Sequence, residues 1–181
     1  MLFKGKGSVN DPSKYRCIGL PVLPHAYKLL ALVMLELISK ECADFLSDWQ
    51  AGFRPERGCR DNVLLLRVIF DHFPEKGEKL CVTSIDYSAA FDSISHKFLD
   101  RSLKNAGASR KTRAMFRAIY AAAEGTARVR GLNGDQVYSA SFKVRRGVIQ
   151  GDIISSIFFI LAMEQIFRAH NASPAGVKVG N

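Results

Sequence analysis

Apolar residues recur at helical spacing in several stretches of the chain, and each stretch predicts an α-helix. Capping residues mark some of the boundaries. Asp61, Ser95 and Ser109 stand where helix N-caps are expected, and Gly107 stands where a helix end favours glycine. The predicted helices cover residues 27–45, 61–70, 95–107, 109–123 and 153–169.

Two further patterns predict strands. The apolar run Leu80–Asp86 is typical of a buried strand, and two β-like runs, 126–132 and 136–144, flank the hairpin dipeptide Asn133-Gly134. Stretches with glycine, proline or polar residues predict loops over 1–24, 49–58, 74–78, 145–152 and 170–181. This order of elements indicates an α+β fold in which a small antiparallel sheet is backed by helices.

Length and charge set broad limits on function. The 181 residues suffice for one domain, or for one domain and part of a second. The chain has 26 Lys+Arg against 17 Asp+Glu, a formal charge of +9. This balance favours a polyanionic partner such as nucleic acid, and it fits a basic surface without such a partner equally well.

Cysteine usage and hydropathy indicate the cellular setting. The cysteines show no CxxC spacing, so we expect reduced thiols in an intracellular protein, nuclear or cytoplasmic. The N-terminus lacks the apolar core of a signal peptide, and we expect no secretion. The most apolar segment, 26–46, carries five charged residues, which argue against a membrane span. The cysteines are Cys17, Cys42, Cys59 and Cys81.

The segment TSIDYSAAFDSISH, residues 83–96, places Asp86 at the end of the predicted buried strand. A carboxylate at the rim of a sheet can bind Mg²⁺, which prefers a few carboxylates together with waters and substrate phosphates. An aspartate that caps the turn Tyr87–Ala89 is the alternative, and for Asp86 taken alone it is the stronger one.

Two other segments carry polar residues suited to a nucleotide. In RRGVIQGD, residues 145–152, Gly147 and Gly151 let the backbone approach a ligand, and Gln150 can hydrogen-bond a ribose, base or phosphate. Asp152 is better interpreted as only a helix cap. The arginines of QAGFRPERGCR, residues 50–60, suit phosphate recognition and fit a solvated basic loop at least as well.

Together these segments resemble the reverse transcriptases of non-LTR (LINE-type) retrotransposons. IDYSAAFDSISH is similar to motif A of that family and RRGVIQGDIISSIFF to motif B, while QAGFRPERGCRDN is similar to a fingers motif and LFKGKGSVNDPSKYRCIGL to the entry segment. The resemblance extends in order over residues 2–168 and implies a right-hand polymerase fold. Residues 1–181 would form a partial reverse transcriptase domain, fingers-like over about 1–78 and palm-like, with some fingers elements, over about 79–181.

The resemblance implies an RNA template, a DNA primer and deoxynucleoside triphosphates as partners, and Mg²⁺ or Mn²⁺ as cofactor. It implies that Asp86 is the catalytic, metal-binding carboxylate and that the backbone carbonyl of Tyr87 adds a ligand. Phe91 would lie under the incoming sugar and exclude a 2′-hydroxyl, with plain core packing as the alternative. Asp92 would support the loop by hydrogen bonding rather than bind metal.

The remaining roles concern phosphates and the nucleotide pocket. Arg54 would neutralise the triphosphate, and Gln150 and Gly151 would line the nucleotide and template pocket. Arg145 and Arg146 would follow template or primer phosphates through salt-sensitive contacts. The sequence does not indicate an oligomeric state.

The sequence departs from the family pattern in three places. Cys17 replaces a proline, and residues 153–156, IISS, replace Pro-Leu-Ser-Pro; both changes conserve shape. Motif C, an aromatic-Ala-Asp-Asp hairpin with the other catalytic carboxylates, is expected after about Gly180, and no Asp or Glu follows Glu164.

We therefore expect the chain to lack the motif C hairpin and the thumb, to expose a sheet edge, and to be inactive alone. The alternatives are a non-catalytic nucleic-acid-binding relic or domesticated protein, and an intron-type maturase, whose pattern fits motif A less well.

Overall fold

The computed structural model describes residues 2–8, 10–11, 14–16, 18–20, 24–75, 77, 79–131 and 133–170. In chain order the elements are β1 (Leu2–Phe3), β2 (Tyr15–Arg16), α1 (Pro24–Glu41), the 3-10 helix η2 (Ala43–Phe45), α2 (Cys59–Glu75), α3 (Ala90–Ser93), α4 (His96–Asn105), α5 (Arg110–Ala121), β3 (Glu124–Gly125), β4 (Arg128–Arg130), β5 (Gln136–Tyr138), β6 (Phe142–Lys143) and α6 (Ser155–His170).

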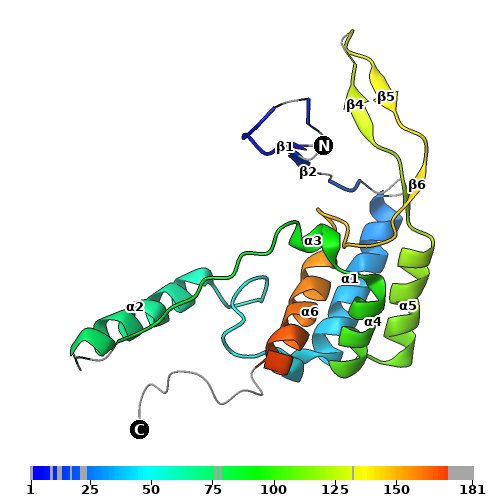
Figure 1. Cartoon of the computed structure of the whole chain (residues 1–181). Helices are drawn as coiled ribbons and strands as arrows, with labels where there is room; N and C mark the ends of the chain where they lie inside the picture. The colour runs from blue at the N-terminus through cyan, green and yellow to red at the C-terminus, as the bar shows by residue number, and fades with distance from the viewer. Residues whose placement is uncertain are drawn as a thin grey trace.

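Four helices, α1, α4, α5 and α6, lie side by side and form the core of the protein (Figure 1). The apolar face of each helix turns toward the others, and α6 contributes the largest buried share because its residues 157–163 are all apolar. The side chains with 2% exposure or less include Met34, Ile38, Leu99, Leu103, Phe116, Ile154, Phe158, Ile160 and Leu161.

The predicted helices are confirmed, with shifts of a few residues at their ends. The predicted caps of α4 and α5 are also confirmed. The Ser95 hydroxyl accepts a hydrogen bond from the Phe98 N–H at 3.2 Å, and the Ser109 hydroxyl accepts one from the Thr112 N–H at 3.2 Å. Each bond satisfies a backbone donor that the first helical turn leaves without a partner. Gly107, with φ +97°, ends α4 in the left-handed conformation that glycine tolerates.

The described strands form three antiparallel two-stranded ladders: β1 with β2, β3 with β6, and β4 with β5. The predicted hairpin is confirmed, and Gly134 takes φ +89° in its turn. The predicted loop over 1–24 contains the short β1–β2 ladder. The mixture of helices and small antiparallel ladders is therefore confirmed. The strands do not join into one sheet in the described part of the chain, and the β4–β5 hairpin extends beyond the helices (Figure 1).

The predicted buried strand Leu80–Asp86 is wrong for this structure. Its residues form no ladder, Leu80 is only half-buried, and the side chains of 81–86 are exposed, with Ile85 65% exposed. A strand requires hydrogen bonds from a neighbouring strand, and none of the described strands runs beside this segment. The apolar run therefore predicted the extended conformation and the wrong burial.

The helix α2 extends away from the four core helices, to the left in Figure 1, whereas the hairpin extends above them. Many of its apolar side chains are exposed, among them Val63, Leu64, Leu65, Leu66, Val68 and Phe70. Within the described residues, no helix is both long and apolar enough to cross a membrane.

Candidate functional site

Two segments distant in sequence meet above the α4 and α6 helices. The short helix α3, from the predicted motif A, is bonded through its backbone to the loop of the predicted motif B. The Gly147 N–H donates to the Ile94 carbonyl at 2.7 Å, and the Val148 N–H donates to the Phe91 carbonyl at 2.8 Å. These bonds fix one segment against the other without using any side chain.

Gly147 makes this contact sterically possible. Its φ is +81°, and a Cβ built on it would lie 2.8 Å from the Asp92 carbonyl oxygen and 2.9 Å from the Asp92 Cα. Real side chains essentially never approach a backbone so closely, so only glycine fits this position. The sequence predicted that Gly147 allows close approach to a ligand, and in the structure it allows close approach to the Asp92 backbone.

Gln150 ties three segments together. Its amide nitrogen Nε2 donates to Asp92 Oδ1 at 2.8 Å, which agrees with the loop-supporting role expected for Asp92. The Gln150 backbone carbonyl accepts from the Gly19 N–H at 2.8 Å. Gly151, with φ +93°, packs against Ile18, whose Cγ2 would lie 3.0 Å from a Cβ at that position. The entry segment thus lies directly on the loop.

His96 is a site residue to which the sequence assigned no role. Its Nε2 lies 3.0 Å from the Gly147 carbonyl oxygen, and its ring packs against Tyr120 at 4.5 Å between centroids. Burial raises the pKa of Tyr120 to about 12, so its hydroxyl stays protonated beside His96. The only signal in the sequence was the place of His96 in the motif A pattern.

Phe91 lies in a cluster of aromatic rings beside Phe159 of α6. Its ring stacks on Phe159 at 4.4 Å with an interplanar angle of 14°, and the Phe53 ring meets it edge-on at 6.2 Å. Phe53 comes from the predicted fingers motif, so this cluster joins that motif to motif A and to α6. The ring of Phe91 has little freedom to rotate because both neighbours hold it.

Asp152 does more than cap a helix, which corrects the sequence interpretation. Its carboxylate accepts a hydrogen bond from the Tyr27 hydroxyl of α1, and the nearby backbone N–H groups of Ile153 and Ile154 act to lower the pKa of its carboxyl. Burial raises the pKa of the Asp152 carboxyl, and the Tyr27 hydrogen bond opposes that shift. Burial and the nearby carboxylate also raise the pKa of Tyr27. The loop is therefore anchored to the core from below.

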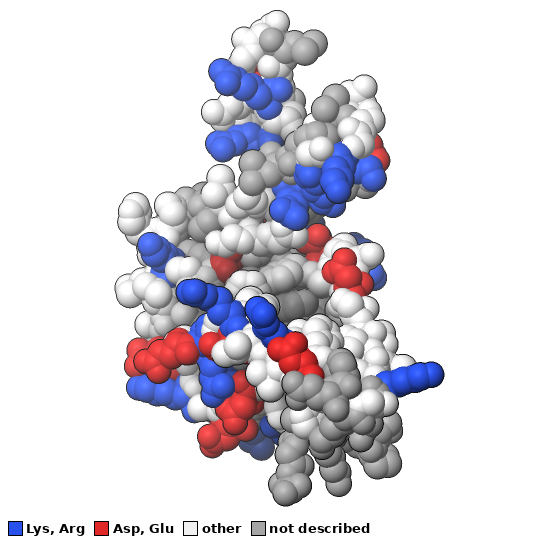
Figure 2. All heavy atoms as spheres, turned by 90° about the vertical axis from the view of Figure 1, so that its left-hand side faces the viewer, with Lys and Arg blue, Asp and Glu red and all other residues white. Residues whose placement is uncertain are grey.

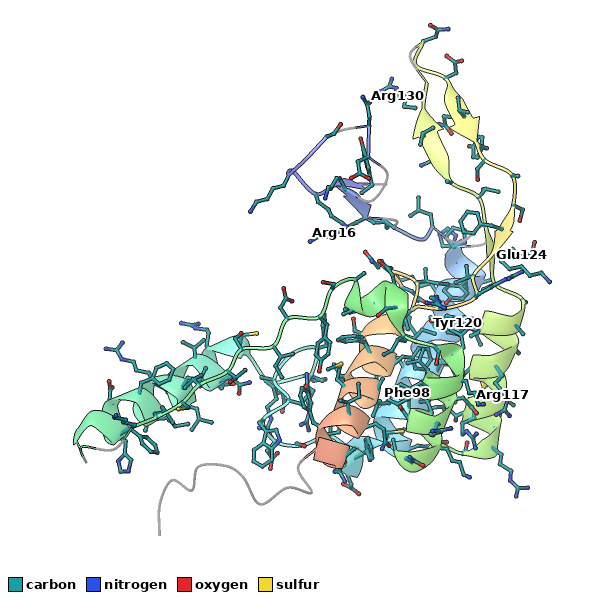
Figure 3. The ribbon with its side chains drawn as sticks, in the orientation of Figure 1. Arg16, Phe98, Arg117, Tyr120, Glu124 and Arg130 are labelled. Atoms are coloured by element: carbon teal, nitrogen blue, oxygen red, sulfur yellow. The ribbon has the colours of Figure 1, made fainter. Side chains whose placement is uncertain are left out.

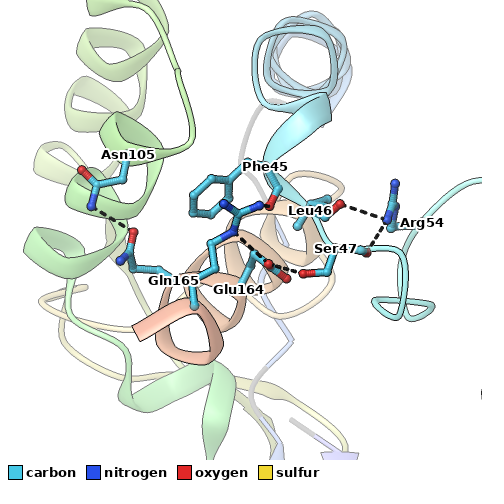
Figure 4. A network of polar contacts seen from close by, with 8 residues as sticks. Phe45, Leu46, Ser47, Arg54, Asn105, Glu164 and Gln165 are labelled. Atoms are coloured by element: carbon cyan, nitrogen blue, oxygen red, sulfur yellow. Dashed lines mark hydrogen bonds and ion pairs between the residues drawn. The ribbon is translucent and has the colours of Figure 1, made fainter. Parts of the chain in front are cut away.

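A polar network holds the segment 45–54, which leads into the predicted fingers motif, against α6 (Figure 4). Glu164, buried in α6, accepts hydrogen bonds from the Ser47 hydroxyl and from Arg168 Nε at 3.0 Å. Arg168 also donates to the Phe45 carbonyl at 2.7 Å and lies over the Phe45 ring at 4.4 Å. Arg54 Nη1 donates to the Ser47 carbonyl at 2.7 Å, which holds its guanidinium beside the chain.

The remaining predicted site residues lie at the surface. Asp86 and Tyr87 belong to the exposed segment before α3, and Arg145 and Arg146 are exposed at the start of the motif B loop. In the described part of the chain, no three His, Cys, Asp or Glu side chains gather closely enough to hold a metal ion. Asp86 therefore offers one carboxylate and does not complete a metal site with its described neighbours.

Comparison with known proteins identifies the family of this chain. The family model for reverse transcriptase (RNA-dependent DNA polymerase) matches residues 4–179. The chain belongs to the reverse transcriptase family. The segments that form the candidate site all fall within the matched range.

Relatives with retrotransposon names support the same conclusion for this reverse transcriptase domain. The chain is similar to the retrovirus-related Pol polyprotein from the type-2 retrotransposable element R2DM of Drosophila melanogaster, with 36% identity over 73% of this chain and 12% of the relative. It is 26% identical to the retrovirus-related Pol polyprotein from the type-1 retrotransposable element R2 of Popillia japonica, over 93% of this chain and 22% of that relative. No solved structure gives a significant match.

The prediction of a retroelement reverse transcriptase domain of the non-LTR type is confirmed by these matches. The chain spans less than a quarter of the length of either relative. Reverse transcriptases act on nucleotides with a nucleic acid template and use divalent metal ions.

Proposed function

We propose that this chain forms the nucleotide-binding part of an RNA-directed DNA polymerase, which extends a DNA primer with deoxynucleotides along an RNA template. One observation carries the proposal. Four segments that resemble family motifs contact one another around α3 and Phe159 of α6: residues 18–19, Phe53, 91–94 and 147–151. Convergence of this kind is expected of a binding site and not of unrelated surface loops.

Asp86 and the backbone carbonyl of Tyr87 would contribute oxygen ligands to Mg²⁺, or to Mn²⁺ in its place. Hard divalent ions prefer such ligands together with waters and substrate phosphates. When bound, a pair of such ions would activate the primer 3′-hydroxyl and stabilise the leaving pyrophosphate. The exposure of Asp86 leaves its carboxylate free to take this role.

Phe91 would select deoxynucleotides by steric exclusion. The stack on Phe159 and the edge contact with Phe53 keep its ring in one place, and a ring that cannot move aside discriminates better than a mobile one. Core packing of Phe91 is compatible with exclusion of a 2′-hydroxyl. The contacts with Phe159 and Phe53 bury part of the ring, and they also fix the position of the part that would face the sugar.

The remaining residues would bind phosphate and nucleotide. Arg54 hydrogen-bonds within the described residues through Nη1 alone, so its Nη2 is available for a triphosphate oxygen. The Gln150 side chain bonds to Asp92, next to Phe91, and Gln150 and Gly151 would line the nucleotide and template pocket from this loop. Arg145 and Arg146, both exposed, would contact template or primer phosphates.

A test of selectivity compares Phe91→Ala with the unchanged chain. Binding of a deoxynucleoside and a ribonucleoside triphosphate would be measured by calorimetry in Mg²⁺. We expect the unchanged chain to prefer the deoxynucleotide by about tenfold or more and Phe91→Ala to lose most of that preference. Phe142→Ala, which removes an exposed ring outside the aromatic cluster, serves as the control.

A test of the metal role uses Asp86→Asn, with Asp71→Asn on the exposed surface of α2 as the matched control. Nucleotide binding should depend on Mg²⁺ or Mn²⁺ in the unchanged chain and in the control, and this dependence should be lost in Asp86→Asn. Equal metal dependence in all three proteins would contradict the proposal. Nucleic acid binding with no metal-dependent nucleotide binding at all would instead support the non-catalytic alternative.

A further inference from the structure

The β4–β5 hairpin is a feature that the proposed nucleotide site does not use. It extends from the helical core into solvent (Figure 1), and its residues make no hydrophobic core of their own. An isolated two-stranded hairpin has little intrinsic stability, and this one has exposed side chains along both strands.

The two faces of this hairpin differ in chemistry. Residues directly opposite in an antiparallel ladder share a face, and the register pairs Arg128 with Tyr138, Val129 with Val137, and Arg130 with Gln136. One face therefore presents two arginines, a glutamine and a tyrosine, and the other presents two valines. We call the first the polar hairpin face: Arg128, Arg130, Gln136 and Tyr138.

The polar hairpin face is organised and accessible. The Tyr138 hydroxyl donates to Gln136 Oε1 at 2.8 Å, and Arg128 Nη1 reaches the same oxygen at 3.5 Å. Tyr138 is 58% exposed, so its ring is open to a ligand. In the described part of the chain neither arginine forms an ion pair, and both keep uncompensated positive charge.

Other basic side chains near the hairpin enlarge the positively charged surface. Figure 2 shows Lys and Arg side chains gathered over the upper end of the molecule, where the hairpin and the N-terminal segment lie, while the helical end below carries both signs. Lys143, Arg145 and Arg146 continue from the hairpin into the motif B loop. In Figure 3, Arg130 points from the hairpin to the side on which β2, with Arg16, lies in that view.

We propose that the polar hairpin face binds single-stranded nucleic acid, with Arg128 and Arg130 on successive backbone phosphates and Tyr138 stacked on a base. Arginine with an adjacent aromatic ring is the combination that single-strand sites use. This inference rests on the proposed function, because the polar hairpin face would hold a strand that leads to the nucleotide site. Template RNA and displaced or target DNA share this chemistry, and the test separates them.

The charge test uses the double variant Arg128→Gln/Arg130→Gln of the full chain. Its control is Arg110→Gln/Lys111→Gln, which removes equal charge from the start of α5, at the other end of that helix from the strands. Dissociation constants for a labelled single-stranded RNA, a single-stranded DNA and an RNA–DNA duplex would be measured against salt concentration. We expect the hairpin variant to reduce the single-strand salt slope by about 1.4, and the control to leave it unchanged.

The stacking test compares Tyr138→Ala with Tyr138→Phe. Loss of the ring should weaken single-strand binding by about tenfold at fixed salt, because one stacked base is lost. Phenylalanine keeps the ring and should bind like the unchanged chain. A greater effect on RNA would assign the face to the template, and a greater effect on DNA would assign it to a primer or target strand.

Equal salt slopes for the hairpin and control variants on every ligand would overturn the inference, and so would unchanged single-strand binding by Tyr138→Ala. The proposed function fails by a different readout, the metal-dependent binding of nucleotide at Asp86. A chain in which Asp86→Asn has no effect on metal-dependent nucleotide binding, while the hairpin variant shows the reduced salt slope, would bind nucleic acid here without being a polymerase.

Discussion

Two helices of this chain have similar length and opposite surroundings. The helix α6 buries Ile157, Phe158 and Leu161 against α1 and α4, whereas α2 leaves Leu64, Leu65 and Val68 in solvent. The difference lies in what each helix packs against within the described residues. Helical periodicity therefore predicts that a helix forms, and it does not predict whether a partner covers the helix.

The same contrast runs through the candidate site. Motif B begins the buried helix α6 and is fixed by backbone bonds to α3, by Tyr27 and by His96. The segment 79–87, which carries Asp86, is extended and largely exposed. The helix α2, which comes before it in the chain, also has many exposed side chains. One half of the site thus stands on the core, and the other half lies in the region that the core does not cover.

The sharpest test of this contrast truncates one leucine in each helix. Leu161→Ala in α6 should lower the free energy of unfolding by about 3–5 kcal/mol, because Leu161 is 0% exposed and leaves a cavity. Leu65→Ala in α2, where the leucine is 53% exposed, should change it by less than about 0.5 kcal/mol. Denaturant unfolding monitored by circular dichroism measures both.

A large loss in Leu65→Ala would break the comparison. It would mean that α2 is covered in solution by packing that its exposed side chains do not reveal. Similar denaturant slopes for both variants are needed for the two free energies to be comparable.

Much of the helical part follows from local signals in the sequence. Ser95, Ser109 and Gly107 mark helix ends because caps depend on one or two neighbouring residues. Asn133-Gly134 predicts the hairpin for the same reason. The apolar run before Asp86 failed as a strand because a strand depends on partners that lie elsewhere.

The candidate site was predictable only as a set of motifs. Their resemblance to one family indicated that Phe91, Asp92 and Gln150 belong together, and the structure brings these three into one cluster. The residues that hold the cluster were not predictable. Tyr27 lies 125 positions from Asp152, and nothing in the local pattern around either residue indicates the bond between them.

A second test addresses the backbone contact between the motifs. Gly147 and Gly77 both have positive φ, but a Cβ at Gly147 meets the Asp92 backbone, whereas a Cβ at Gly77 meets nothing within 4 Å. Gly77→Ala should cost about 1 kcal/mol from backbone strain alone. Gly147→Ala should cost about 2–3 kcal/mol, because overpacking adds to the same strain.

The measurement is again denaturant unfolding, with nucleotide binding as a second readout. We expect Gly147→Ala to weaken nucleotide binding and Gly77→Ala to leave it unchanged, since only the former displaces the loop that carries Gln150. If the two variants were equally stable, the close approach of Gly147 to Asp92 would not matter for folding.

The smallest expected effect compares two ion pairs as pH falls. Asp100 of α4 accepts hydrogen bonds from Arg113 and Arg117 of α5, and the Arg113 bond is the main cause that lowers the pKa of the Asp100 carboxyl. A lowered folded-state pKa gives stability that is present above the unfolded value, near 3.9, and is lost as pH falls through the folded value. Asp100→Asn should therefore be less stable by about 1 kcal/mol near pH 7.

The gap between Asp100→Asn and the unchanged chain should begin to narrow as pH falls below about 4, and it should close once pH is below the lowered folded-state pKa, where the native carboxyl is protonated as well. Asp71 of α2 lies 4.0 Å from Arg67, with both side chains largely exposed, so Asp71→Asn should have almost no effect at any pH. Thermal unfolding from pH 3 to pH 7 would measure both variants. A gap for Asp100→Asn that stayed constant over this range would show that the residue stabilises the α4–α5 contact by packing and not by charge.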